Sequence, residues 1–237
     1  MNQNALRTLY MVDSPPNAVY AEAALIHVTY DYTKIATCPE CGQYVSGAYW
    51  ERPREIVLTS RKIPDFLYAY CDNVGFLLSE RALTAIRDAG LTGITCAEKI
   101  EHARFQRKAK KEVEIPPYYH IELARSRITL DHANSVIQYG KICYPEQYCP
   151  LCNQVPRTRD FTRKLAFHLD AYEGYDIFQT YELGDAVFLS QRFVDVCKEK
   201  KLKNLCYTPV EQDGRWAAEY FLDGNENAAE LYRHHLR

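Results

Sequence analysis

The chain has 237 residues, of which 47% are hydrophobic and 25% charged, and this composition excludes a largely disordered protein. A formal net charge of −2 gives no global attraction to nucleic acid or to an anionic membrane. The first ten residues carry no apolar run suited to a signal peptide, and no stretch is long and apolar enough to span a bilayer. We therefore expect a cytoplasmic protein with no membrane partner.

The first half opens with a predicted strand at residues 8–12, followed by a Cys-Pro-x-Cys motif at Cys38 and Cys41. Two residues between cysteines allow one tight turn to aim both sulfurs at the same metal ion. Gly42 follows the motif and adopts positive φ without strain. This segment therefore predicts a zinc knuckle.

A short apolar run at residues 75–78 predicts a buried strand. Ser79 follows it at an N-cap position, so we expect a helix over residues 80–89. Leu83 and Ile86 would face the core, and the helix would end at Gly90 in a left-handed cap. Extended structure is expected to resume over residues 91–95.

Residues 99–111 are rich in lysine and arginine and are followed by Pro116 and Pro117. These charged side chains predict an exposed basic helix or linker between the two halves. Because the residue before a proline disfavours the helical backbone conformation, we expect this segment to end at the prolines.

The second half repeats the order, with an opening strand at 119–123, a motif at Cys149 and Cys152, and a strand at 186–189. Asn153 follows this motif and is a residue type enriched at positive φ. Ser190 is the predicted cap of a second helix. The buried residues expected on that helix are Phe193, Val194, Val196 and Cys197.

The two halves share one offset, because 149 − 38 = 111 and the same spacing relates the predicted caps and helices. Six of thirty positions are identical between residues 65–94 and 176–205; coincidence between two ordinary strand–helix segments is the alternative. We predict an α+β fold of two pseudo-repeat halves, each with the order strand, zinc knuckle, strand, helix, strand. Residues 1–111 form one half and 112–237 the other, which ends in an acidic extension.

Four cysteines in equivalent positions, Cys38, Cys41, Cys149 and Cys152, predict one structural zinc ion shared by the halves. Three alternatives remain open. Each pair could complete its own site with a histidine or another cysteine, a pair could be a redox motif, or the site could be an empty relic. The other cysteines considered as ligands are Cys71, Cys96 and Cys143.

The two motifs, with the Ser-x-Arg helix start at Ser190 and the ending Pro209-Val210, resemble the bacterial double-CXXCG motif family and immunity proteins of polymorphic and contact-dependent toxin systems. This resemblance implies an inhibitor, active in interbacterial competition, that neutralises a cognate secreted toxin by protein–protein interaction. It implies no catalytic residues, no small-molecule ligand and no enzyme activity. It identifies no toxin-contact residues; the acidic stretch from Glu211 to Glu230 is one candidate.

Two other functions remain open from the residues alone. A nucleic-acid-binding zinc-ribbon protein is conceivable because Arg157, Arg159 and Arg163 follow the second motif, although nucleic acid is the less favoured partner. An enzyme is conceivable at His120 or His168, but no nucleophile is fixed beside either.

Overall fold

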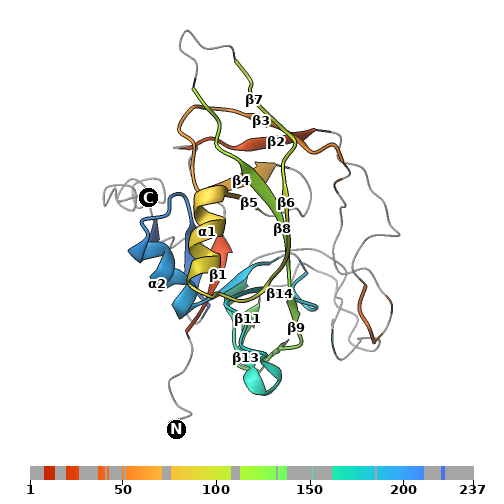
Figure 1. Cartoon of the computed structure of the whole chain (residues 1–237). Coiled ribbons are helices and arrows are strands. Elements are labelled where there is room, and N and C mark those ends of the chain that lie inside the picture. The colour runs from red at the N-terminus through yellow and green to blue at the C-terminus, as the bar shows by residue number, and fades with distance from the viewer. Residues whose placement is uncertain are drawn as a thin grey trace, which may run out of the picture.

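The structure is a computed structural model of the whole chain (Figure 1). It describes residues 8–13, 20–26, 37–40, 42, 50, 52–70, 76–107, 113–131, 133–137, 151, 162–184, 186–210 and 220–221. Within these ranges the fold is mixed α+β, with two α-helices and two large sheets. None of the described helices is long and apolar enough to cross a membrane.

The larger sheet has seven strands in the order β6-β8-β5-β4-β2-β3-β7. They are β6 (Ile94–Lys99), β8 (Tyr118–Leu123), β5 (Phe76–Ser79), β4 (Phe66–Tyr70), β2 (Ala23–Ile26), β3 (Glu55–Leu58) and β7 (His102–Phe105). Only Ile100 and Glu101 separate the two edge strands β6 and β7. Because two residues span at most about 7 Å, the sheet must curl into a half-barrel to bring its edges together.

The inside of the half-barrel is filled by apolar side chains that alternate with exposed ones, as a strand requires. In β2, for example, Ala23 and Leu25 are buried while Ala24 between them is exposed. The buried cluster is Ala21, Ala23, Leu25, Trp50, Ile56, Leu58, Leu67, Leu77, Ile100 and Tyr118.

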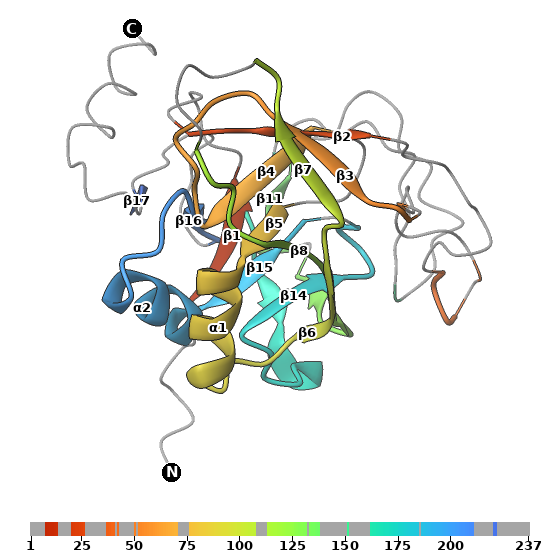
Figure 2. The ribbon, with the colours of Figure 1, turned by 45° about the horizontal axis from the view of Figure 1, so that its top comes forward.

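The second sheet has six strands in the order β17-β16-β1-β15-β14-β9. They are β17 (Tyr220–Phe221), β16 (Cys206–Pro209), β1 (Leu9–Asp13), β15 (Phe188–Ser190), β14 (Ile177–Thr180) and β9 (Arg125–Ser126). Two small ladders lie beside it (Figure 2). They pair β10 (Thr129–Leu130) with β13 (Phe167–His168), and β11 (Val136–Ile137) with β12 (Thr162–Lys164); a 3-10 turn, η2 (Leu169–Ala171), follows β13.

The sheets do not follow the boundary between residues 111 and 112. Strand β1 lies between β15 and β16, although these strands come from the end of the chain. Strand β8 lies between β5 and β6, which precede that boundary. Each sheet thus contains one strand from the other half of the chain.

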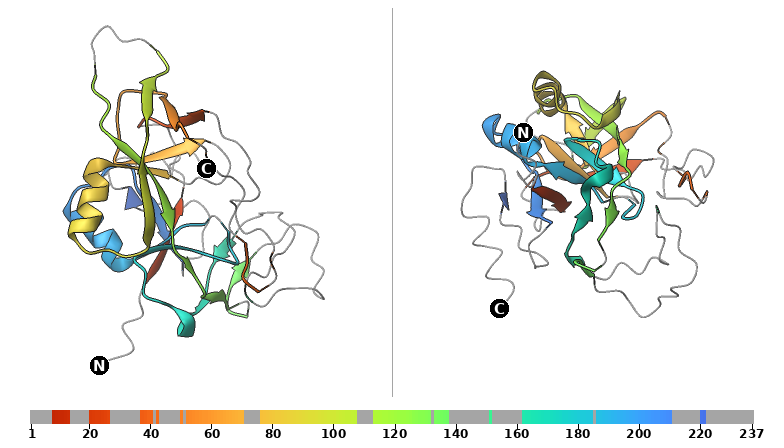
Figure 3. Two further views of the ribbon diagram at one scale, coloured as in Figure 1. Left: turned by 45° about the vertical axis from the view of Figure 1, so that its right-hand side comes forward. Right: turned by 90° about the horizontal axis from the view of Figure 1, so that it is seen from below.

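The helices are α1 (Glu80–Asp88) and α2 (Gln191–Glu199), and they lie side by side (Figure 1 and Figure 3). The caps predicted at Ser79 and Ser190 are confirmed, because their side chains accept hydrogen bonds from the backbone N–H groups of Ala82 and Phe193. Each serine thus provides an acceptor for a backbone N–H group that has no partner within the first turn of the helix. This is why each helix can begin directly after a strand.

The inner faces of the two helices share one core with both sheets. Leu83 and Ile86 of α1 are buried, as predicted, and so are Phe193, Val194 and Cys197 of α2; Val196 is only partly buried. Burial raises the pKa of the Cys197 thiol, which therefore stays protonated and packs as a small apolar side chain.

The prediction of a basic helix or linker over residues 99–111 is wrong where the structure describes that segment. Residues 102–105 form strand β7, which pairs in parallel with β3. Phe105 packs against the half-barrel core, and Arg104 Nε donates to Glu55 Oε1 at 2.8 Å. These tertiary contacts outweigh the local preference of a charged segment for helix.

The turn after α1 approaches β14 so closely that it requires glycine. Gly93 has φ 112°, and a Cβ atom there would lie 1.8 Å from the backbone oxygen of Ile177. The clashing atom belongs to the backbone, so no small side-chain movement can make room for a Cβ atom. The positive φ angle is also unfavourable for any residue other than glycine.

We expect Gly93→Ala to lower the free energy of unfolding in a urea titration by about 3 kcal/mol or more. Gly90→Ala is the matched control, because Gly90 also has a positive φ of 61° but its nearest foreign atom is Arg192 Nη2 at 3.7 Å. The control should cost only about 1–2 kcal/mol. Equal losses for the two variants would contradict the close approach.

Candidate functional site

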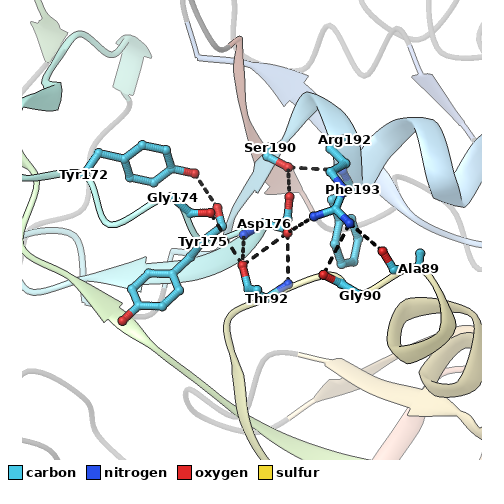
Figure 4. A network of polar contacts seen from close by, with 10 residues as sticks. All are labelled: Ala89, Gly90, Thr92, Tyr172, Gly174, Tyr175, Asp176, Ser190, Arg192 and Phe193. Carbon is cyan, nitrogen blue, oxygen red and sulfur yellow. Dashed lines mark hydrogen bonds and ion pairs between the residues drawn. The ribbon is translucent and has the colours of Figure 1, made fainter.

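A buried carboxylate, Asp176, joins the two halves of the chain (Figure 4). Its Oδ1 accepts a hydrogen bond from Ser190 Oγ at 2.8 Å. Its Oδ2 accepts from Thr92 N at 2.9 Å and from Arg192 Nη1 at 3.1 Å. The side chain of Asp176 is only 7% exposed, so these donors replace the water that a carboxylate would otherwise need.

Asp65 makes the corresponding contacts in the other half. Its Oδ1 accepts from Ser79 Oγ at 2.8 Å, and its Oδ2 accepts from Arg81 Nη1 at 2.7 Å and from Lys203 N at 2.8 Å. Each of these residues lies 111 positions from its counterpart around Asp176, since 176 − 65, 190 − 79, 192 − 81 and 203 − 92 all equal 111.

The two arginines reach across to the end of the opposite helix. Arg81 Nη2 donates to the backbone oxygens of Lys200 and Lys201 at 2.6 and 3.0 Å. Arg192 Nη2 donates to the backbone oxygens of Ala89 and Gly90 (Figure 4). A cation at a helix C-terminus stabilises the helix dipole and satisfies carbonyls that have no partner within the helix.

Chemically, this arrangement is a clamp. Each carboxylate is held by fixed donors from a helix start, an arginine and the backbone of the opposite turn. We name the two sets, Asp65-Ser79-Arg81 and Asp176-Ser190-Arg192, the paired clamps. The sequence contained a signal for them, because these three residue types account for three of the six identities at the 111 offset.

A second polar cluster lies at the half-barrel and is centred on Arg54, which is 1% exposed. Its guanidinium pairs with Glu98, and its Nε donates to the backbone oxygen of Trp50 at 3.1 Å. The Trp50 ring lies below the guanidinium, with 5.9 Å between Cζ and the ring centroid. A buried arginine needs such partners, because an unpaired charge in the interior is strongly destabilising.

His120, one of the two histidines considered for catalysis, is part of this second cluster. Its ring packs edge-on against Trp50 with centroids 6.0 Å apart. Burial and the charge of Arg54 lower its pKa to about 4, so the imidazole is neutral at pH 7. Burial and the nearby Glu122 raise the pKa of the Cys96 thiol, which is therefore not an activated nucleophile. The other histidine, His168, is exposed in β13.

Of the four predicted zinc ligands, only Cys38 is among the described residues; Cys41, Cys149 and Cys152 lie outside them. Cys38 is 1% exposed and packs against Leu151, with Tyr181 beside them. Gly42 has the expected positive φ of 73°, and its N–H donates to Cys38 O at 2.8 Å. Within the described ranges, no three His, Cys, Asp or Glu side chains are grouped to hold a metal.

Comparison with known proteins identifies one family. Residues 49–212 match the model of the immunity protein family Imm11, which covers more than half of the chain and leaves Cys38 and Cys41 outside the match. The comparison does not show the double-CXXCG motif family. No curated protein matches the chain.

The match supports the immunity-protein interpretation of the sequence and excludes the enzyme alternative, because proteins of this family are non-enzymatic toxin inhibitors. Matched residues include both paired clamps and both helices, which lie between residues 65 and 203. The chain belongs to the Imm11 family of immunity proteins.

Proposed function

We propose that this protein binds a cognate secreted bacterial toxin in the cytoplasm of the producing cell and neutralises it stoichiometrically. The observation that carries the proposal is the family match over residues 49–212. The fold is suited to this role, because the paired clamps and the strands β1 and β8, each paired with strands of the other half, fix the two sheets against each other. An inhibitor whose surface is fixed in advance loses little conformational entropy on binding.

We also propose that residues 1–111 and 112–237 are two copies of one unit that have exchanged their first strands. The strand orders β6-β8-β5-β4 and β16-β1-β15-β14 support this. The register supports it too, since Phe66 pairs with Leu78 in one sheet and Ile177 with Leu189 in the other, again 111 residues apart.

A third proposal is that Cys38, Cys41, Cys149 and Cys152 bind one structural zinc ion. Support comes from the contact of Cys38 with Leu151, because Leu151 lies between Cys149 and Cys152 in the sequence. A site with four thiolates is closed, so zinc here would stabilise the fold and carry no catalysis.

The main proposal predicts rescue in a growth assay. Cells expressing the toxin domain encoded directly upstream of this chain should stop growing, and co-expression of this chain should restore growth. The two proteins should also elute as a one-to-one complex in size-exclusion chromatography. Continued toxicity with soluble inhibitor present, or separate elution, would refute the assignment.

The duplication predicts matched effects at the paired clamps. Asp65→Ala and Asp176→Ala should each lower the free energy of unfolding by about 2–4 kcal/mol, because each leaves buried donors without an acceptor. Asp195→Ala, on the exposed face of α2, is the control and should cost less than about 0.5 kcal/mol. Losses that differ by more than about 2 kcal/mol between the clamps would argue against equivalent halves.

The zinc proposal predicts about one equivalent of zinc in the purified protein by elemental analysis. Cys38→Ser should reduce that content severalfold, since a serine hydroxyl is a poor replacement for a thiolate ligand. Cys96→Ser serves as the control and should leave zinc unchanged. Zinc-free wild-type protein, or full zinc content in the Cys38 variant, would overturn the shared site; two equivalents would favour separate sites.

A further inference from the structure

The turns that end the two helices have the same backbone. After α1, Leu91 N donates to Ile86 O at 3.1 Å and Gly90 N donates to Arg87 O at 2.9 Å. The turn after α2 has the same two bonds, from Leu202 N to Cys197 O at 3.0 Å and from Lys201 N to Lys198 O at 3.1 Å. Both are the Schellman motif, which places one residue in the left-handed conformation.

The side chains on these two turns differ sharply. Residues 89–93 read Ala-Gly-Leu-Thr-Gly, and residues 200–204 read Lys-Lys-Leu-Lys-Asn. The leucine recurs because it packs against the helices' core. The backbone bonds do not require the lysines, since the first turn makes the same bonds with alanine, glycine and threonine in their places.

Lys201 is also unfavourable for the fold itself. It has φ 50°, where the equivalent residue, Gly90, has φ 61°. A side chain in the left-handed region costs conformational energy that glycine avoids. A residue retained in such a conformation where glycine would serve better points to a role outside the fold.

Four lysines project from the end of α2 and its turn, and all are exposed. We name them the lysine turn: Lys198, Lys200, Lys201 and Lys203. One acid, Glu199, lies among them and pairs with Lys200 Nζ at 2.8 Å. At the equivalent positions of α1, Arg87 is balanced by Asp88 and the other three residues are uncharged. The two turns therefore share a backbone and differ by three positive charges.

We propose that the lysine turn is a contact surface for an acidic face of the cognate toxin, an inference that rests on the proposed function. Lysine is depleted from the centres of interfaces but common at their polar rims. Charges at a rim chiefly accelerate encounter between complementary partners and add little to the lifetime of the complex. The surface therefore predicts fast, salt-sensitive capture.

Transplanting the first turn onto the second gives a sharp test. The triple variant Lys200→Ala, Lys201→Gly, Lys203→Thr copies residues 89, 90 and 92, so the backbone is preserved and the left-handed position receives glycine. Its thermal midpoint should equal or exceed that of the wild type. The association rate with the purified upstream-encoded toxin domain should fall about tenfold at low salt and converge with the wild type at high salt. The dissociation rate should change less than about twofold.

The control variant Lys99→Ala, Arg104→Ala, Arg107→Ala removes the same number of cations from exposed positions at the end of β6 and along and after β7. Strand β7 lies away from α2 (Figure 1). Its association rate should stay within about twofold of the wild type. An equal loss in both variants would show a net-charge effect and overturn the assignment to the lysine turn.

The remaining outcomes separate the two proposals. Toxin captured by the wild type and by the transplanted variant at the same rate would refute the lysine turn and leave the immunity function intact. A variant with altered stability but normal capture would show that the lysines serve the chain itself, for instance its acidic stretch from Glu211 to Glu230, and would also refute the contact. Failure of the wild type to bind any upstream-encoded toxin domain would refute both.

Discussion

The buried carboxylates of Asp65 and Asp176 are the constraint on which the arrangement of both helices depends. Each is removed from water and held by a serine, an arginine and a backbone N–H group. The serine that donates to the aspartate also caps the helix, so the carboxylate fixes where the helix begins. The backbone donor comes from the turn after the opposite helix. One charged group thus sets the start of one helix and the end of the other.

Strands β1 and β8 add a second tie between the halves. Strand β1 enters the six-stranded sheet, while β2, which follows it, enters the half-barrel beside β4. Strand β8 lies in the half-barrel, while β9 after it joins the other sheet beside β14. Because each half contributes a central strand to the other sheet, neither sheet can unfold without removing hydrogen bonds from its neighbour. The described part of the chain should accordingly unfold as one cooperative unit.

Local features of this fold were predictable from sequence, and the long-range pairing was not. Ser79 and Ser190 were recognised as caps because a polar acceptor stands directly before an amphipathic run, and that signal is local. The opening strands at Leu9–Asp13 and Tyr118–Leu123 were also predicted. Their pairing with strands of the other half was not predicted, because apolar alternation gives the inward face of a strand and says nothing about which neighbours it pairs with.

The bent segment from Ile94 to Phe105 shows the same limit. Its charged second part was predicted as helix or linker, yet β7 closes the half-barrel by pairing with β3, whose paired residues lie 47 positions earlier (102 − 55). The two aspartates show a related limit. Comparison at the 111 offset revealed that positions 65 and 176 are both aspartate, but it did not reveal that these side chains are buried. A carboxylate following a proline or a tyrosine in a polar segment resembles an exposed loop residue until its three partner residues are known.

The equivalence of the two turns also explains how an inhibitor can change its surface without losing its fold. Arg81 and Arg192 bind backbone oxygens at the helix ends, and these contacts are independent of the side chains at those positions. Leu202, which is buried, and Leu91, which is partly buried, provide the packing. Lys200, Lys201 and Lys203 of the second turn are exposed side chains that lie outside the core. One turn carries small, nearly neutral residues and the other carries lysines, so the same backbone turn is compatible with either surface charge.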